Sequence, residues 1–249
     1  MTQRVALVTG AMGGLGTAIC QELAKAGNKV VASYHPQFDN KDAWLAEMAA
    51  AGFNDFVCVA GDVSSLEDCQ KMVAEAEAAA GPVDILINNA GITRDRMFAK
   101  MERDGWDAVI ATNLTSLFNM TKQVSAKMAE RGWGRIINVG SQQTWKAFGN
   151  SGVYGVAKAG VAGLSRSQSE AWAASGVTSN TLIPGFVVTP MTLPTVAVPG
   201  VEEALASRSH IGRNGLPADF AGVAVWLASE GAAFVTGQTI AVDGGFSVK

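Results

Sequence analysis

Apolar β-type runs and helical stretches alternate along the whole chain of 249 residues. Strands are expected near 4–9, 29–33, 56–60, 83–88, 134–140, 177–183 and 238–242, and helices near 15–26, 41–51, 65–80, 102–130, 153–174 and 217–229. This alternation predicts an α/β fold, a doubly wound parallel sheet of about seven strands with helices on both faces and right-handed crossovers. We find no linker or internal repeat, so the prediction is one domain spanning 1–249.

The first strand leads directly into a glycine-rich loop. Residues 4–9 (RVALVT) are followed by 10–16 (GAMGGLG), and then by a helix expected to bury Ile19, Leu23 and Ala24. Glycines let the backbone approach a pyrophosphate, and the helix N-terminus supplies free N–H groups and a positive dipole end. The spacing is G-x-x-x-G-x-G rather than the commoner G-x-G-x-x-G. We therefore predict nucleotide binding, with a glycine-rich turn that binds no ligand as the alternative.

Tyr154 and Lys158 are spaced to lie one helical turn apart on the same face. A lysine cation within a few ångströms favours the phenolate, so we expect Lys158 to lower the pKa of Tyr154 from its ordinary value of about 10. Ser141 follows the apolar run 135–140, and a hydroxyl at the carboxyl end of a strand points into the usual ligand crevice of an open sheet. Alone, each pattern is compatible with an ordinary helix residue or a capping serine.

The combination is far more specific than its parts. The motifs occur in the order T-G-x-x-x-G-x-G (9–16), N-N-A-G (88–91), Asn113, Ser141, Y-x-x-x-K (154–158) and P-G (184–185). This set resembles the short-chain dehydrogenase/reductase family over essentially the whole chain. The resemblance implies a single-domain Rossmann-type oxidoreductase that uses NAD or NADP.

The resemblance also implies roles for four catalytic residues. Tyr154 would protonate the substrate oxygen, and Lys158 would lower the pKa of Tyr154 and hold the nicotinamide ribose. Ser141 would hydrogen-bond the substrate oxygen, and Asn113 would orient a water that links Lys158 to solvent. The chemistry is consistent with these roles, because hydride transfer leaves an alkoxide that needs a proton.

The cofactor residues are carried over in the same way. The pyrophosphate loop would be formed by Gly10, Gly14, Leu15 and Gly16; the adenine and its ribose would meet Asp62, Val63, Asn89, Ala90 and Gly91; the carboxamide would meet Pro184, Gly185 and Thr189. The second strand ends in Ser33 and Tyr34 followed by His35, with no carboxylate to bind a ribose 2′-hydroxyl. We therefore expect NADP, with Ser33 and Tyr34 near its 2′-phosphate, although no arginine is adjacent.

The first half of the chain resembles the acetoacetyl-CoA reductases, most clearly at 88–95 (NNAGITRD), 113–119 (NLTSLFN) and 131–135 (RGWGR). From Gln142 onward the chain is more similar to sugar or polyol dehydrogenases of the family. The best hypothesis is reduction of acetoacetyl-CoA, and another carbonyl or polyol dehydrogenase is the alternative. A non-redox lyase or a cofactor-binding regulator is more remote, because the glycine loop and Lys158 are retained.

Composition excludes several other classes. Charged residues are 16% and apolar residues 48% of the chain, which excludes a disordered protein. The net charge of −3 and a pI near 5.4 argue against binding to nucleic acid. With two histidines and three cysteines without C-x-x-C spacing, we expect no metal site and reduced thiols in a cytoplasmic protein. No signal peptide or membrane span is expected.

Two further expectations concern a mobile segment and assembly. Residues 186–212 contain three prolines and no periodicity, so we expect an irregular lid over the substrate. The helix near 153–174 carries small residues at Ala157, Ala159, Gly160, Ala162 and Gly163. Small residues allow a neighbouring helix to approach closely, and members of the family usually pair their long helices, so we expect a homotetramer.

Overall fold

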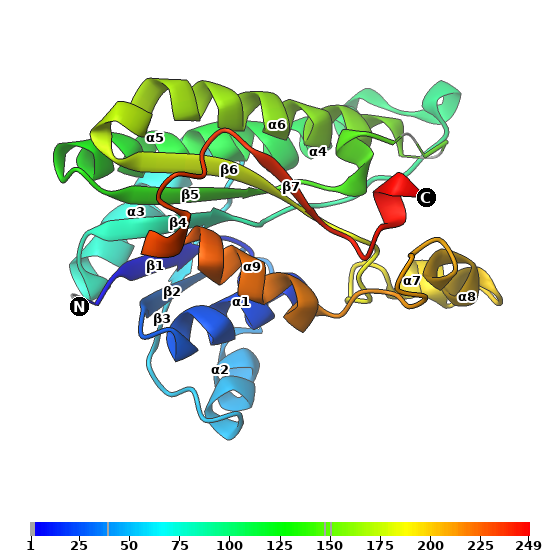
Figure 1. The fold of residues 1–249 in the computed structure, drawn as a ribbon. Coiled ribbons are helices and arrows are strands. Elements are labelled where there is room, and N and C mark those ends of the chain that lie inside the picture. Colours follow the sequence, from blue (N-terminus) through cyan, green and yellow to red (C-terminus); the bar gives the residue numbers. More distant parts are fainter. Residues whose placement is uncertain (1–2, 39, 147, 150) are drawn as a thin grey trace.

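The computed structural model describes residues 3–38, 40–146, 148–149 and 151–249, and it confirms the alternation of strands and helices (Figure 1). The strands are β1 Val5–Val8, β2 Lys29–Tyr34, β3 Phe56–Ala60, β4 Val83–Asn88, β5 Gly134–Val139, β6 Val177–Pro184 and β7 Thr239–Val242. They form one parallel sheet of seven strands in the order β3-β2-β1-β4-β5-β6-β7. The predicted fold class is therefore confirmed.

The strand order reverses at β1, which pairs with β2 on one side and β4 on the other. In an open α/β sheet, ligands bind beyond the carboxyl ends of the strands at such a switch point. The motifs at 9–16 and 88–91 follow β1 and β4 directly, so the topology brings both to this crevice.

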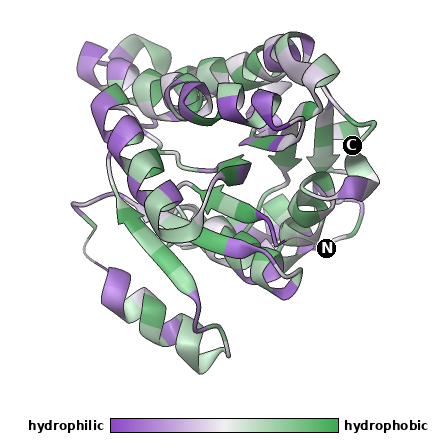
Figure 2. Cartoon of the chain, turned by 90° about the vertical axis from the view of Figure 1, so that its left-hand side faces the viewer, coloured by the Kyte–Doolittle hydropathy of each residue, from purple (hydrophilic) through white to green (hydrophobic). Residues whose placement is uncertain are grey.

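Helices cover both faces of the sheet (Figure 1). They are α1 Gly14–Lys25, α2 Lys41–Ala50, α3 Leu66–Ala80, α4 Arg103–Ile110, α5 Ser116–Glu130, α6 Gly152–Trp172, α7 Leu193–Val196, α8 Val201–Ala206 and α9 Pro217–Leu227. In β1, Ala6 and Val8 pack toward α1 and α9, whereas Val5 and Leu7 pack toward α3 and α5. Because both faces are covered, most strand residues are buried and most of these are apolar, as the largely green strands between mixed-colour helices show in Figure 2.

One predicted helix is divided in two. The sequence favoured a continuous helix over 102–130, but Ala111–Thr115 forms a π-helical turn between α4 and α5. The side chain of Asn113 leaves this turn to bond the Ile92 backbone twice, its Oδ1 accepting from the amide N and its Nδ2 donating to the carbonyl O, both at 2.8 Å. Such turns are frequently found at functional sites.

The segment 186–212 is also more regular than predicted. It contains the short helices α7 and α8, so the expectation of an irregular segment was wrong in this respect. Pro194 stands in the first turn of α7, where its missing N–H and fixed φ are tolerated. Gly200 precedes α8 with φ +78°, a left-handed conformation that favours glycine.

A buried polar network joins the sheet to α5 and α6. Asn138 of β5 lies at its centre: its Nδ2 donates to Ser165 Oγ and Gln168 Oε1, each at 2.9 Å, and its Oδ1 accepts from Asn88 Nδ2 at 2.8 Å. Thr121, Ser179 and Thr181 extend the network. Since β5 leads to Ser141 and α6 carries Tyr154 and Lys158, these bonds set the position of one candidate catalytic element against the other.

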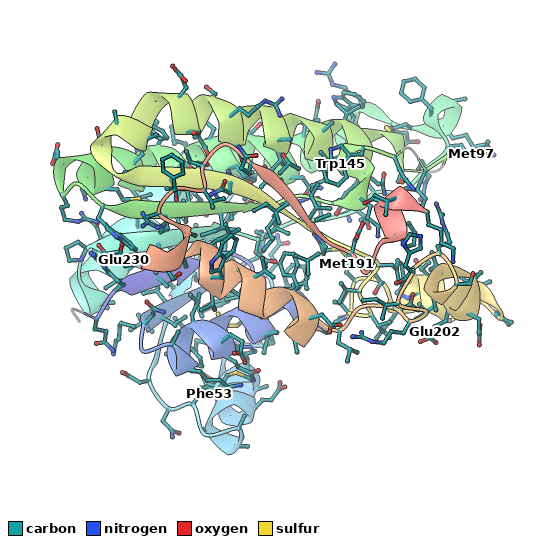
Figure 3. All side chains as sticks on the ribbon, in the orientation of Figure 1. Phe53, Met97, Trp145, Met191, Glu202 and Glu230 are labelled. Carbon is teal, nitrogen blue, oxygen red and sulfur yellow. The ribbon has the colours of Figure 1, made fainter. Side chains whose placement is uncertain are left out.

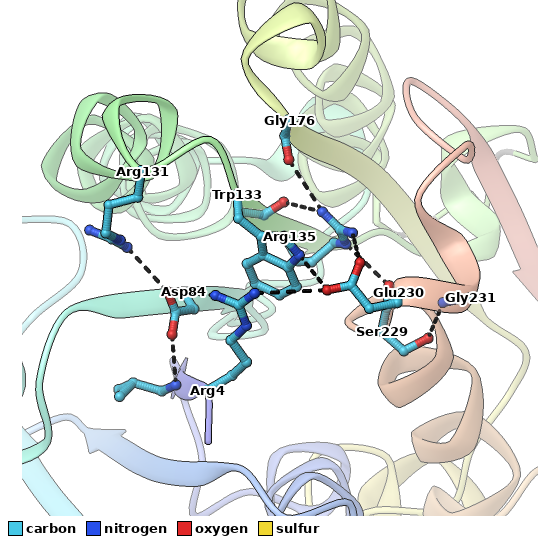
Figure 4. Close-up of polar contacts among 11 residues, drawn as sticks. Arg4, Asp84, Arg131, Trp133, Arg135, Gly176, Ser229, Glu230 and Gly231 are labelled. Atoms are coloured by element: carbon cyan, nitrogen blue, oxygen red, sulfur yellow. Dashed lines mark hydrogen bonds and ion pairs between the residues drawn. The ribbon is translucent and has the colours of Figure 1, made fainter. Parts of the chain in front are cut away.

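A second polar cluster lies at the amino ends of β1, β4 and β5, away from the carboxyl ends where the site is predicted (Figure 4). The Trp133 ring lies 3.8 Å from the Arg4 guanidinium carbon and 4.3 Å from that of Arg135, measured to the ring centroid. Its indole N–H donates to Glu230 at 2.8 Å. Arg4 also faces Asp84 at 3.7 Å. This cluster lies at the far edge from the predicted site.

Candidate active site

The glycines of the loop lie in close contact with other parts of the chain. Gly10 has φ +60°, and a Cβ there would lie 2.9 Å from Ala90 Cα. A Cβ on Gly16 would lie 2.3 Å from the Gly10 carbonyl oxygen, and one on Gly14 would lie 2.9 Å from Thr189. Each predicted glycine is therefore needed for a close backbone approach.

The N-terminus of α1 is uncapped by any side chain. Gly13 precedes the helix in an extended conformation and offers no side-chain acceptor, so the first N–H groups of α1 have no side-chain partner. An anion at this position would satisfy these donors and interact favourably with the helix dipole. These residues fit a dinucleotide pyrophosphate, with Leu15 in the first turn.

Thr9 and Asn89 lock the loop to the end of β4. Thr9 Oγ1 accepts from the backbone N of Asn89 at 3.0 Å and of Ala90 at 3.1 Å. The Asn89 side chain donates to the carbonyls of Thr9 and Gly10, both at 3.0 Å. Asn89 and Ala90 thus shape the loop, and the sequence had indicated no role for the Thr9 hydroxyl.

The end of β2 presents two accessible polar side chains. Ser33 is only 1% exposed, whereas Tyr34 and His35 are half-buried. His35 Nε2 lies 3.7 Å from Asp62 Oδ2, and Asp62 accepts from Ser64 N and Oγ, both at 2.8 Å. Burial raises the pKa of Asp62, but the bonds from Ser64 and the neighbouring His35 outweigh it and hold the pKa below its ordinary value.

Val63 follows Asp62 at the same edge of the sheet. Its side chain is buried, and its carbonyl accepts from Asn119 Nδ2 at 3.2 Å, so α5 fixes this turn. Asp62 and Val63 therefore lie beside the accessible end of β2, and an adenine contact there stays a prediction.

Ser141, Tyr154 and Lys158 come together beyond the carboxyl end of β5. Ser141 starts a 3-10 turn, where its Oγ accepts from Gln143 N at 3.2 Å. Its hydroxyl is also near enough to Tyr154 to act on the pKa of the phenol. Lys158 is buried, and its Nζ lies 5.7 Å from the Tyr154 ring centroid and donates to Val139 O at 2.7 Å. The predicted one-turn spacing on α6 is confirmed.

The expected pKa shift of Tyr154 was wrong in direction. Burial raises the pKa of Tyr154 to about 12, opposed by the Ser141 hydrogen bond and reinforced by the charge of Asp95. Burial also lowers the pKa of Lys158 to about 8. The sequence spacing revealed that Tyr154 and Lys158 are neighbours but not their desolvation, which is the largest cause of both pKa shifts.

Asn113 and Gly91 complete the floor of the site. A Cβ on Gly91 would lie 3.3 Å from Asn113 Oδ1 and 3.8 Å from Lys158 Nζ, so the three residues are neighbours. The Asn113 side chain is fully buried and committed to Ile92, which leaves its main chain, within the π-helical turn, as the part available for other partners.

Pro184 and Gly185 end β6 beside the end of β7. A Cβ on Gly185 would lie 2.7 Å from Asp243 Cα, so glycine is required here. Thr189 follows, and its backbone N donates to Thr192 Oγ1 at 2.9 Å. Through its contact with Gly14, Thr189 joins the segment 186–212 to the glycine loop.

Two residues near the site lie outside the sequence motifs. Gln143 accepts from Ser151 Oγ at 2.9 Å, and its Oε1 lies 3.4 Å from the position of a Cβ on Gly155. Asp95 is close enough for its charge to act on Tyr154. Gln143 follows Ser141 by two positions and Asp95 follows Gly91 by four, and this closeness to the motifs could have suggested that both lie near the site.

No group of three or more His, Cys, Asp or Glu side chains that could hold a metal ion occurs within the described ranges. In the same part of the chain, no helix has both the length and the apolar character needed to cross a bilayer.

Comparison with known proteins decides the family. A family model described as enoyl-(acyl carrier protein) reductase matches residues 10–247. The chain belongs to the short-chain dehydrogenase/reductase family. It is accordingly an oxidoreductase of a family that uses nicotinamide cofactors, as the sequence motifs predicted.

Relatives in this family match along their full length. The chain is 51% identical to nodulation protein G of Azospirillum brasilense, over 100% of both chains. It is 46% identical to acetoacetyl-CoA reductase of Cupriavidus necator, over 98% of both chains. Among solved structures, a gluconate 5-dehydrogenase from Burkholderia cenocepacia in complex with NADP and tartrate is similar with a TM-score of 0.93 and 32% identity, covering 100% of this chain and 97% of that one.

Proposed function

We propose that this oxidoreductase reduces acetoacetyl-CoA to 3-hydroxybutyryl-CoA with NADPH. The observation that carries the proposal is the arrangement of Ser141, Tyr154 and Lys158 beside the glycine loop, in a chain similar over its whole length to an acetoacetyl-CoA reductase. A phenol near a serine hydroxyl and a lysine is suited to handling the proton of a carbonyl/alcohol pair.

In this mechanism NADPH supplies the hydride. Ser141 donates a hydrogen bond to the substrate oxygen and stabilises the negative charge that develops there. Tyr154 then transfers its phenolic proton to that oxygen. Lys158, cationic below a pKa of about 8, stabilises the phenolate that remains. Asn113, through its position beside Gly91, supports a route for reprotonation from solvent.

The proposed NADP preference rests on the absence of a carboxylate at the end of β2, where Tyr34 and His35 are accessible and Ser33 is buried. A Tyr34→Asp variant should shift preference toward NADH, because a carboxylate repels the 2′-phosphate. The ratio of kcat/KM values for NADPH and NADH, measured before and after the change, tests this. A clear NADH preference in the unmutated enzyme contradicts it.

The proposed dinucleotide contacts follow the fit of the site. We assign the pyrophosphate to the loop of Gly10, Gly14, Leu15 and Gly16, and the carboxamide to Pro184, Gly185 and Thr189. Asp62 and Val63 face the adenine, and Asn89, Ala90 and Gly91 lie below its ribose. We also propose that 186–212, including α7 and α8, is the substrate lid.

We further propose a cytoplasmic homotetramer that pairs its α6 helices. Ala157 and Ala162 are buried in their own subunit and Gly160 packs on Leu114, so only part of the small-residue stripe is free for pairing. Ala159 and Gly163, with the half-exposed Val156, lie on the outer face and support the proposal. Light scattering at micromolar concentration distinguishes a tetramer from a monomer.

A second candidate is oxidation of a sugar acid or polyol. It is favoured by the similarity to a gluconate 5-dehydrogenase. The decisive assay measures NADPH oxidation with acetoacetyl-CoA and with 5-ketogluconate, and then repeats both with NADH. A kcat/KM that is higher for the sugar acid by tenfold or more would favour the second candidate.

A further inference from the structure

A loop at the mouth of the site carries unpaired positive charge. We call residues 94–100 the rim loop; it exposes Arg94, Arg96 and Lys100 and contains one carboxylate, Asp95. Among the residues that the structure describes, the Arg94 and Arg96 side chains donate only to the backbone carbonyls of Thr93 and Asp95, at 3.1 and 3.0 Å. Within the described residues, none of the three cations has an acidic partner within 4.0 Å. The loop is therefore positively charged although the whole chain has a net charge of −3.

The rim loop also exposes large apolar side chains. Met97 is 62% and Phe98 73% exposed. Met97 lies with Trp145 and Met191 at the same end of the molecule as the carboxyl ends of the strands (Figure 3). Exposed apolar groups next to cations are typical of a surface that binds an amphipathic, anionic ligand.

The rim loop is held against the catalytic helix. Arg96 forms a β-bridge with Ser151, and a Cβ on Gly152 would lie 3.4 Å from the Phe98 ring. Both contacts involve residues within three positions of Tyr154, and the charge of Asp95 in the loop helps to raise the pKa of that phenol. The backbone of the loop is therefore fixed, and its cations are held beside the entrance to the site rather than on a distant surface.

We propose that the rim loop binds the nucleotide end of a CoA thioester, with Arg94 and Arg96 contacting its phosphates and Phe98 stacking on its adenine. The inference rests on the proposed function, because it takes acetoacetyl-CoA as the substrate. CoA carries a diphosphate and a 3′-phosphate, which match a cluster of guanidinium groups, and arginine binds phosphate with two parallel hydrogen bonds. An aromatic ring offers the adenine a stacking surface.

The test compares variants on two substrates that share one reacting end. Acetoacetyl-CoA carries the phosphates and the adenine, whereas the acetoacetyl thioester of N-acetylcysteamine carries neither. The double variant Arg94→Ala/Arg96→Ala removes the charges from exposed positions, and Arg94→Lys/Arg96→Lys retains them. Arg103→Ala is the matched control, because Arg103 is an exposed arginine on the adjacent α4 that pairs with Asp107 at 2.7 Å.

We expect the double alanine variant to raise KM for acetoacetyl-CoA about tenfold, with kcat changed far less. Its kcat/KM for the truncated thioester should fall far less than for the CoA thioester. The double lysine variant should recover part of the loss, and Arg103→Ala should match the parent. KM of the parent for acetoacetyl-CoA should rise with salt, more steeply than in the alanine variant. Phe98→Leu should weaken CoA binding while its side chain still packs on Gly152.

Binding of free CoA, measured by calorimetry on the NADP-loaded enzyme, separates this inference from the proposed function. Binding that weakens about tenfold in the double alanine variant supports the rim loop even if acetoacetyl-CoA is not reduced, a result that overturns the proposed function alone. No binding by the parent, or equal losses on both thioesters, overturns the rim-loop inference. A kcat/KM that falls for acetoacetyl-acyl carrier protein but not for acetoacetyl-CoA would also overturn it, because the loop would then bind a protein partner.

Discussion

Replacing Asn138 with alanine tests whether the buried polar network holds α6 against the sheet. The change removes three donated bonds, to Ser165, Gln168 and, at 3.4 Å, Ser179, and one accepted bond from Asn88. Ser165 keeps a partner in Thr181, and Gln168 keeps one in Ser179. Asn88 Nδ2 is left with only a 3.4 Å contact to Thr121. The main loss is therefore one buried donor without a good partner.

A buried unsatisfied donor costs about 1–3 kcal/mol, and each exchanged hydrogen bond contributes about 0.5–1.5 kcal/mol. The expected loss in the free energy of unfolding is about 3 kcal/mol, before any relaxation around the small cavity. For a chain of this length, 1 kcal/mol shifts Tm by about 2–4 °C, so Tm should fall by about 6–12 °C. Since the network positions α6, kcat should also fall at temperatures where the variant is fully folded.

The assay is thermal and urea unfolding at one fixed protein concentration, with kcat measured well below the transition. Asn28→Ala is the control, because Asn28 makes a single side-chain bond to Leu23 O at 2.9 Å near the end of α1. It should cost about 1 kcal/mol and leave kcat unchanged. If Asn138→Ala lowers the free energy of unfolding by about 1 kcal/mol or less, no more than the control does, the reasoning is refuted.

Three further outcomes are expected. Tyr154→Phe should lower kcat by about 10²–10⁴-fold with cofactor affinity nearly intact, measured by steady-state kinetics and NADPH titration; activity within a few-fold of the parent would exclude Tyr154 as the acid. The kcat/KM for reduction should fall as the pH rises through the Lys158 pKa of about 8, because the cation is present below that pH and lost above it; a flat profile to pH 10 contradicts this. Trp133→Ala should cost about 2 kcal/mol of stability through two lost cation–π contacts and the bond to Glu230, without changing kcat, and equal urea midpoints would refute it.

The sheet could be predicted from sequence because its strands are buried on both faces. Runs such as 5–8 are continuously apolar and short, and the glycine loop marks where the first strand ends. The order of the motifs then placed Ser141 and the Tyr154–Lys158 pair at one edge. These features depend on local sequence and on the topology that alternation dictates.

The misses depend on tertiary contacts. The apolar pattern of 102–130 shows no break at the π-helical turn. That turn coincides with the bond between Asn113 and Ile92, which are 21 residues apart in the sequence, so local sequence gives no sign of it. The helices α7 and α8 are too short to show periodicity. The tyrosine pKa depends on how much water reaches Tyr154, and no spacing reports that.

The protonation states bear on the direction of the proposed reaction. With a pKa of about 12, Tyr154 is a neutral phenol at neutral pH, and with a pKa of about 8, Lys158 is largely cationic there. A neutral phenol is the form that donates a proton to a developing alkoxide, whereas oxidation of an alcohol needs the phenolate to accept one. The resting site is thus prepared for reduction near neutral pH. Because burial sets both pKa values, a change that admits water beside Tyr154 would return its pKa toward 10 and raise the fraction of phenolate that can act as the base in alcohol oxidation.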